Sequence, residues 1–154
     1  TRRLSSAASD VYKRQVIHIV RDGRDCYCSS KIHPDIPQNK SVQSFARYWQ
    51  KCVKSAQPLQ NHANILTIKY EELVSSPQIS LHEIMAFLGL KYETNQLNRL
   101  IYGADSRSRL EVFSKLGKPI DAYSVGRYVS EMSEEECRDF MRIARKELSY
   151  HGYL

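Results

Sequence analysis

Two short runs of aliphatic and β-branched residues are the clearest strand signals in the chain. The first is 16–20 (VIHIV) and the second is 64–69 (NILTIK). Apolar runs of this length are typical of strands buried in a parallel sheet. The first run stops at the charged cluster 21–25 (RDGRD), and the second leads directly into Tyr70.

Helical patterns fill most of the remaining chain. Asp22 is a suitable N-cap for a short helix that ends near residue 31. Apolar side chains recur at helix spacing over 41–56, over 77–88 and over 134–149. The expected core positions of the first and last of these three are Val42, Phe45, Ala46, Trp49, Val53, Cys137, Phe140, Met141, Ala144 and Leu148.

Capping residues support these boundaries. Ser76 and Pro77 open the middle helix as N-cap and first helical residue, and Gly89 is a natural C-cap. Ser133, with Glu three residues later, forms a capping box for the last helix. Residues 95–102 are expected to be helical, and 103–124 are polar and irregular. Strands that alternate with helices predict an α/β layered fold with a parallel sheet.

Composition narrows the class of protein. The 154 residues, 42% hydrophobic and 26% charged, suffice for one domain with a core. No run approaches the roughly 20 apolar residues that a membrane helix needs, so no membrane contact is expected within this chain. The four cysteines and the scattered histidines lack the spacing of metal ligands. We therefore expect reduced, structural cysteines and no metal site.

The first 15 residues do not match the rest. Residues 5–15 read SSAASDVYKRQ, which is the in-frame translation of a widely used transposase sequencing adapter, and they show no hydrophobic period. We expect 1–15 to be a non-native, disordered tail and 16–154 to be the protein domain. The net charge is +6, and the tail carries +3 of it, which leaves +3 for the domain. A mildly basic domain fits a polyanionic cofactor, and no nucleic acid partner is expected.

Arg21 stands where the first strand ends, and ligands of open α/β sheets bind outside the carboxyl ends of the strands. Its guanidinium fork can hold two phosphate oxygens, and the helix that follows points free N–H groups at the same place. Ser29, two turns into that helix, can donate a hydroxyl. Together they predict a phosphomonoester site. The alternative is that Arg21 and Arg24 pair with Asp22 and Asp25 on the surface.

This segment resembles the second cofactor motif of the sulfotransferases. It has a β-branched strand, then R-D-x-R-D, then Ser eight positions after the first Arg. In that family the strand-end Arg and the helix Ser bind the 3′-phosphate of PAPS (3′-phosphoadenosine-5′-phosphosulfate). The resemblance therefore implies these roles for Arg21 and Ser29.

Two later segments extend the resemblance. Residues 70–73 (YEEL), followed by 87–90 (FLGL), resemble the family's Y-E-D-L strand end and F-L-G-L helix end. This implies that Tyr70 lies near the adenine, where an aromatic ring can stack; the alternative is a Tyr that caps the core. Glu71 and Glu72 are expected to hold helix N-termini or to pair with basic residues.

Residues 124–128 (SVGRY) resemble the G-R-W segment that precedes the last helix of many sulfotransferases, and 148–153 resembles the family's L-G-Y ending. The first similarity implies that Arg127 reaches a phosphate or the sulfonate. Lys118 is a further candidate in the same loop. The alternative for both is a solvated basic loop.

The resemblance covers 16–154 and implies a three-layer, P-loop-NTPase-like sulfotransferase fold that is incomplete. The family's first strand and its phosphate loop, P-[KR]-[ST]-G-[ST]-[ST], have no counterpart in this sequence. The family's catalytic base also lies upstream, so we assign no catalytic residue, and His18 is expected to be a core residue. The chain is expected to be a fragment that supplies the 3′-phosphate and adenine side of the cofactor site and is inactive alone.

The implied parent activity is transfer of a sulfonate from PAPS to a hydroxyl or amine. The acceptor is a small molecule, a carbohydrate or a protein, and the sequence does not decide among them. A cytoplasmic location is expected, with the Golgi lumen also open. Two other interpretations remain: a fragment of a P-loop nucleotide-kinase-like phosphotransferase, and a non-enzymatic nucleotide-binding domain.

Overall fold

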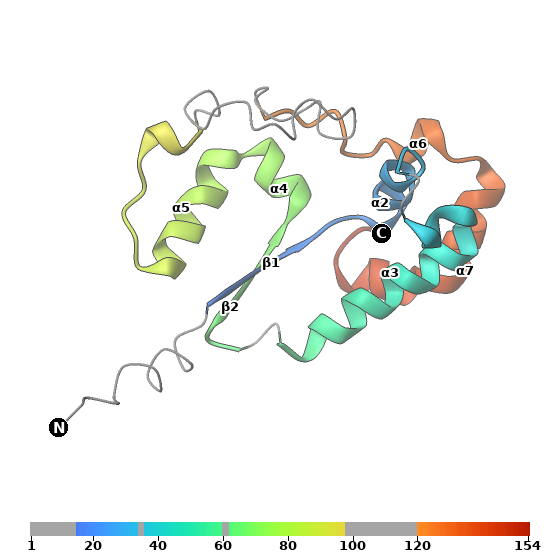
Figure 1. The fold of residues 1–154 in the computed structure, drawn as a ribbon, viewed down its shortest axis with the longest axis horizontal. Helices are drawn as coiled ribbons and strands as arrows, with labels where there is room; N and C mark the ends of the chain where they lie inside the picture. The colour runs from blue at the N-terminus through green and yellow to red at the C-terminus, as the bar shows by residue number, and fades with distance from the viewer. Residues whose placement is uncertain (1–14, 34–35, 60–61, 98–119) are drawn as a thin grey trace.

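Two parallel strands form the centre of the chain, and the helices lie beside them and beyond their ends (Figure 1). The computed structural model describes residues 15–33, 36–59, 62–97 and 120–154. Strand β1 (Val16–Val20) pairs with β2 (Ile65–Lys69) in parallel, with Val20 opposite Lys69. The predicted α/β class with a parallel sheet is confirmed.

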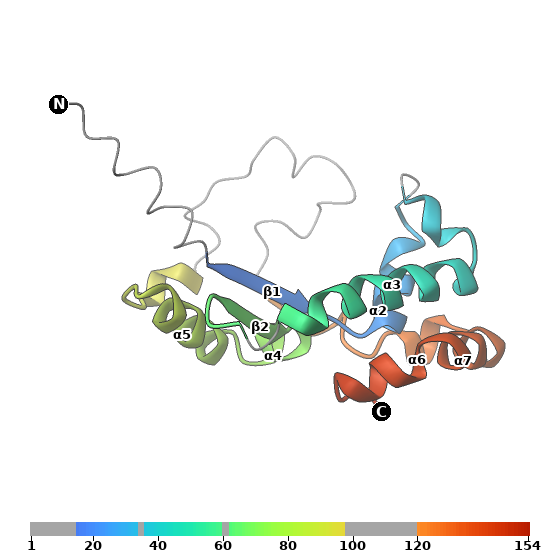
Figure 2. The same cartoon turned by 90° about the horizontal axis from the view of Figure 1, so that it is seen from below.

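Helices make up most of the remaining described chain, and they fall into two groups (Figure 2). One group packs beyond the carboxyl end of β1, and the other lies beside β2. The α-helices are α2 (Gly23–Ser30), α3 (Val42–Ala56), α4 (Tyr70–Ser75), α5 (Pro77–Leu88), α6 (Tyr128–Glu131) and α7 (Glu134–Tyr150). Short 3₁₀ turns are η1 (Pro37–Lys40), η2 (Gln57–Leu59) and η3 (Thr94–Leu97).

The predicted caps lie where the sequence places them. The carboxylate of Asp22 accepts a hydrogen bond from the backbone N–H of Arg24, and Ser133 forms the full capping box. Gly89 ends α5 at φ 69°, in the left-handed region that glycine adopts without steric cost. Ser76 is the N-cap of α5 but makes no side-chain hydrogen bond there.

The core lies between α2, α3 and α7. All five positions predicted for α3 are buried, and so are Phe140, Ala144 and Leu148 of α7. Cys137 and Met141 pack at the margin of this core and are only partly buried. Trp49 and Phe140 meet near its centre, with ring centroids 6.0 Å apart.

The prediction of fully buried strands is wrong for most of β1. Val20 is 3% exposed, but Ile17 and Ile19 are 37% and 51% exposed. Within the described residues β1 has β2 as its single sheet neighbour, and α5 packs on β2. An apolar run in the sequence shows that a strand is hydrophobic, but it does not show how many other elements pack on that strand. His18 is half-buried, with its Nδ1 3.3 Å from the hydroxyl of Thr67, so it is not a full core residue.

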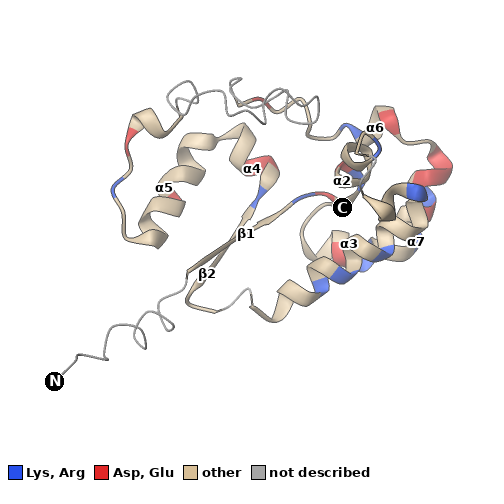
Figure 3. Cartoon of the chain, viewed as in Figure 1, with Lys and Arg blue, Asp and Glu red and all other residues tan. Residues whose placement is uncertain are grey.

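Several predicted features lie outside the described residues. These are the tail up to residue 14, the part of the helix predicted at 95–102 that follows Leu97, and Lys118. Among the residues that are described, no helix is long and apolar enough to span a membrane. Charged side chains are spread over the helices, with an acidic cluster in the first turn of α7, where it complements the helix dipole (Figure 3).

Candidate functional site

Arg21 and Tyr70 are adjacent because of the sheet register. Val20 pairs with Lys69 at the ends of the two strands, so Arg21 and Tyr70, which follow them, leave the sheet at the same edge. The guanidinium carbon of Arg21 lies 4.4 Å from the centroid of the Tyr70 ring, a cation–π contact. Arg21 Nη2 also donates to the backbone oxygen of Ser124 at 2.6 Å. The guanidinium is therefore held by an aromatic face and by one carbonyl.

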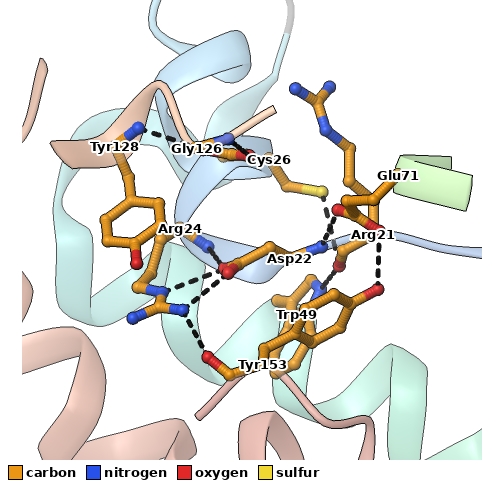
Figure 4. Close-up of polar contacts among 10 residues, drawn as sticks. Arg21, Asp22, Arg24, Cys26, Trp49, Glu71, Gly126, Tyr128 and Tyr153 are labelled. Carbon is orange, nitrogen blue, oxygen red and sulfur yellow. Dashed lines mark hydrogen bonds and ion pairs between the residues drawn. The ribbon is translucent and has the colours of Figure 1, made fainter. Parts of the chain in front are cut away.

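The backbone of Arg21 is fixed from the core side. The indole N–H of Trp49 donates to the Arg21 carbonyl at 3.1 Å, and the Cys26 thiol lies 4.0 Å from the same oxygen. In Figure 4 the Arg21 side chain points away from Asp22 and Arg24. Its Nε is buried and has no hydrogen-bond partner among the described residues. A donor with this orientation fits an anionic ligand beside Arg21, since a buried N–H without an acceptor costs free energy.

Ser29 lies in the same pocket as Arg21. The pocket has a volume of about 390 Å³ and lies between α2, the segment after it and the start of α3. Besides Arg21 and Ser29, its walls are formed by Cys26, Ser30, His33, Ile36, Pro37, Gln38, Phe45 and Tyr48. The structure thus brings Arg21, Ser29 and Tyr70 to one end of the sheet.

Arg24 and Asp22 form an ion pair that is buried and not on the surface, which corrects the alternative drawn from the sequence. Arg24 Nε and Nη2 lie 3.0 and 2.6 Å from the two oxygens of Asp22 (Figure 4). Arg24 also donates to the carbonyl of Tyr153 at 2.8 Å and stacks 3.9 Å from the centroid of the Tyr128 ring. The second Arg of the motif therefore links α2 to the C-terminal segment and is not available to a ligand.

Asp25, unlike Asp22, forms no ion pair with an Arg of the described residues. Its two carboxylate oxygens accept the backbone N–H groups of Gly126 and Tyr128, at 2.7 and 3.0 Å. Asp25 is 1% exposed, and burial raises its pKa above the ordinary value although the two N–H donors act in the opposite direction. The last acid of the RDGRD segment holds a turn that follows it by about 100 residues in the chain.

Arg127 belongs to that turn, but its side chain lies elsewhere. Arg127 Nε donates to Glu131 Oε1 at 2.7 Å, one turn along α6, and Arg127 does not line the pocket that contains Arg21 and Ser29. Gly126, before it, has φ 71° and so suits glycine. Of the four residues predicted for the cofactor site, Arg127 is the one that forms an ion pair elsewhere, with Glu131.

Glu71 supports the start of α2, in agreement with its predicted role. Its Oε1 accepts the backbone N–H of Asp22 at 3.0 Å, and its Oε2 accepts the hydroxyl of Tyr153 at 3.1 Å. Glu71 therefore connects the beginning of α4 with α2 and with the C-terminal segment. Because both of its oxygens are used in this way, it serves as a structural residue.

The pocket offers no activated thiol. Burial raises the pKa of Cys26 to about 12, so the group is a neutral thiol at physiological pH. All four cysteines are free. The described residues contain no cluster of His, Cys, Asp or Glu that could hold a metal ion. Arg21 and Ser29 give this pocket a guanidinium and a hydroxyl, both of which can donate hydrogen bonds.

Comparison with known proteins gives one family. A family model described as "Sulfotransferase family" matches residues 13–94. Two solved structures share the fold: mouse sulfotransferase SULT7A1 in complex with PAP (TM-score 0.60, 19% identity, covering 90% of this chain) and a sulfotransferase domain from the curacin biosynthetic pathway (TM-score 0.55, 17% identity, covering 86% of this chain). The chain spans 59% and 52% of their respective lengths. No curated protein sequence matches it.

Proposed function

The chain belongs to the sulfotransferase family, and we propose that it forms the 3′-phosphate and adenine side of a PAPS site. In this proposal Arg21 and Ser29 bind the 3′-phosphate, Tyr70 lies against the adenine, and Arg127 approaches a phosphate or the sulfonate. The whole protein transfers a sulfonate from PAPS to a hydroxyl or amine of a small-molecule, carbohydrate or protein acceptor.

One observation carries the proposal. Arg21 lies at the carboxyl end of the sheet and lines a pocket together with Ser29, and its Nε is buried with no hydrogen-bond partner among the described residues. Tyr70 and the Ser124 carbonyl hold the guanidinium from two sides, so little side-chain freedom remains to be lost on binding. A preorganised guanidinium beside a hydroxyl and a helix start suits a phosphomonoester.

The residues present fit the nucleoside end of the cofactor and not its reacting end. When bound, PAPS supplies the sulfonate and a phosphate leaving group. Arg21 and Ser29 would neutralise and orient the 3′-phosphate, which fixes the position of the nucleotide without taking part in bond cleavage. The sequence contains no Gly-rich phosphate loop, so we expect no sulfonate transfer by this chain alone. A cytoplasmic setting is part of the proposal, because reducing compartments maintain free cysteines like those seen here.

Titration calorimetry with PAP, the desulfonated cofactor, tests the proposal. The full 154-residue chain should bind PAP more tightly than AMP, which lacks the 3′-phosphate. Arg21→Ala should weaken PAP binding by about 10- to 100-fold, the range expected when hydrogen bonds to a charged group are lost, and should leave AMP binding unchanged. Ser29→Ala should act in the same direction with a smaller effect.

Arg142→Ala is the matched control. Arg142 is 72% exposed and pairs with Asp139 on α7, so its loss removes one positive charge without touching the pocket. PAP affinity should be unchanged in this variant. Equal affinity of the wild-type chain for PAP and AMP, or an equal loss in Arg21→Ala and Arg142→Ala, would contradict the proposal. Turnover of PAPS by the chain alone would contradict the predicted lack of activity.

A further inference from the structure

Asp25 is a buried carboxylate with an unusual set of partners. It is 1% exposed and accepts two backbone N–H groups, and no Lys or Arg among the described residues forms a salt bridge with it. Removing an ionised carboxylate from water is costly, and neutral backbone donors offset less of that cost than a cation does. The raised pKa of Asp25 reflects this. A group retained under such conditions calls for an explanation beyond helix packing.

Its two donors belong to the turn that holds Arg21. Ser124, at the start of the turn, provides the carbonyl that accepts Arg21 Nη2 at 2.6 Å. Gly126, two residues later, donates its N–H to Asp25 at 2.7 Å. Asp25 lies four residues after Arg21. The 21–25 segment therefore contacts the 124–128 turn twice, through Arg21 at Ser124 and through Asp25 at Gly126. Gly126, at φ 71°, adopts the left-handed backbone conformation within this turn.

We infer that Asp25 is a positioning residue for the 3′-phosphate site: it fixes the 124–128 turn, and through the Ser124 carbonyl it fixes the guanidinium of Arg21. This rests on the proposed function. Asp25 touches neither the ligand nor the reacting atoms. Its role is to keep Arg21 in the orientation in which the Tyr70 ring covers the guanidinium and the Ser124 carbonyl accepts from Nη2.

Asp25→Asn tests the inference in the full chain, because it keeps the shape of the side chain but replaces one acceptor oxygen by a donor that faces a backbone N–H. PAP affinity should fall about tenfold, within the range measured for coupled neighbours, while AMP affinity should not change. In an Arg21→Ala background, Asp25→Asn should cause no further loss, since the residue that it positions is absent. If Asp25 served only folding, Asp25→Asn would lower the affinity for PAP and for AMP to the same extent.

Glu147→Gln is the matched control. Glu147 is also 1% exposed, but it lies in the core of α3 and α7, where it binds Gln50 and Lys54. This variant should leave the preference for PAP over AMP unchanged. If Asp25→Asn does not fold, Gly126→Ala serves as the second variant, because a Cβ there has no neighbour within 4 Å among the described residues and acts on the backbone of the turn. It should lower PAP affinity only where Arg21 is present.

The outcomes separate the two proposals. If the wild-type chain prefers PAP and loses the preference in Arg21→Ala, the proposed function stands. If Asp25→Asn and Gly126→Ala then retain the full preference for PAP, the positioning role is wrong. If the wild-type chain has no preference for PAP, the proposed function fails first, and the role of Asp25 in it fails with it.

Discussion

The α2, α3 and α7 region and the β2, α4 and α5 region differ sharply in how well they are packed. In the first, Ala46, Phe140, Ala144 and Leu148 are completely buried. In the second, residues 65–88, the buried apolar side chains are Ile68 and Ile84, whereas Ile79 of α5 is 71% exposed. Local stability follows buried apolar contacts, so the first region is expected to be the rigid part of the described chain.

The candidate site draws on both regions. The backbone of Arg21 is tied to the packed region by Trp49, while the Tyr70 ring that covers its guanidinium comes from the sparsely packed one. The residue that contacts the 3′-phosphate in our proposal is therefore anchored on the rigid side. We expect substitutions in the packed region to affect stability strongly, and substitutions around α5 to affect it weakly.

The largest effect is expected from Phe140→Ala. Phe140 is 0% exposed and packs against Trp49, so its removal leaves a cavity and should cost about 4 kcal/mol of unfolding free energy. Ile84→Ala, in the other region, should cost about 2 kcal/mol, because α5 is covered less completely and can relax. Urea unfolding followed by circular dichroism measures both. Equal costs would break the distinction between the two regions.

Gly23→Ala should cause the next largest loss of unfolding free energy. A Cβ at Gly23 would lie 2.5 Å from Trp49 Cδ2 and 2.7 Å from Phe140 Cζ, so the core must shift, at a cost of about 3 kcal/mol. Gly89→Ala is the comparison from the other region. There a Cβ meets no described residue within 4 Å, and the backbone strain at φ 69° costs about 1 kcal/mol. A larger loss for Gly89→Ala in the same unfolding experiment would contradict the packing argument.

Glu147 should make the packed region sensitive to acid. Burial alone would raise the pKa of Glu147, but hydrogen bonds from Gln50 and Lys54 outweigh burial and hold it below the ordinary value of 4.5. A lowered carboxyl pKa stabilises the fold above 4.5, and this contribution is lost as the pH falls through the lower, folded-state value. Thermal unfolding of the wild type and of Glu147→Gln should therefore differ at pH 7 by about 1 kcal/mol and converge at acidic pH. Curves that stay parallel would exclude this role.

The smallest effect is expected from Ile79→Ser. Ile79 is 71% exposed, so the change should alter the unfolding free energy by less than about 0.5 kcal/mol. Amide hydrogen exchange provides a second measurement, with faster exchange expected in α5 than in α7. Strong protection of α5 would show that the sparsely packed region is more stable than its burial indicates.

The helices were predictable because their signals are local. The capping box at Ser133 and the apolar stripe of α3 depend on side chains three or four positions apart, so the sequence contains them in full. Burial of β1 was not predictable in this way. The exposure of Ile19 depends on which elements cover the strand, and the apolar run itself carries no information about them.

For the site, the sequence indicated the residues but not all of their partners. Arg21 and Tyr70 lie together because each directly follows one of two parallel strands, a relation that the strand predictions already imply. Ser29 joins Arg21 because it belongs to the helix that follows the first strand. The contact of Arg24 with the Tyr153 carbonyl and that of Asp25 with Gly126 were missed because these partners lie 129 and 101 residues away in the chain. Gly23 carried a usable signal, since a glycine at the start of a helix often marks close packing, but only the structure identifies Trp49 as its neighbour.

Trp49 is the only tryptophan in the sequence, and its indole N–H is bonded to the carbonyl of Arg21. All of the tryptophan emission of this protein therefore comes from a fluorophore directly behind the candidate phosphate-binding residue. The indole lies in the core, so its emission should be blue-shifted in the folded chain and should respond to any displacement of the Arg21 backbone. The protein thus contains an optical reporter of its own site, without any added label.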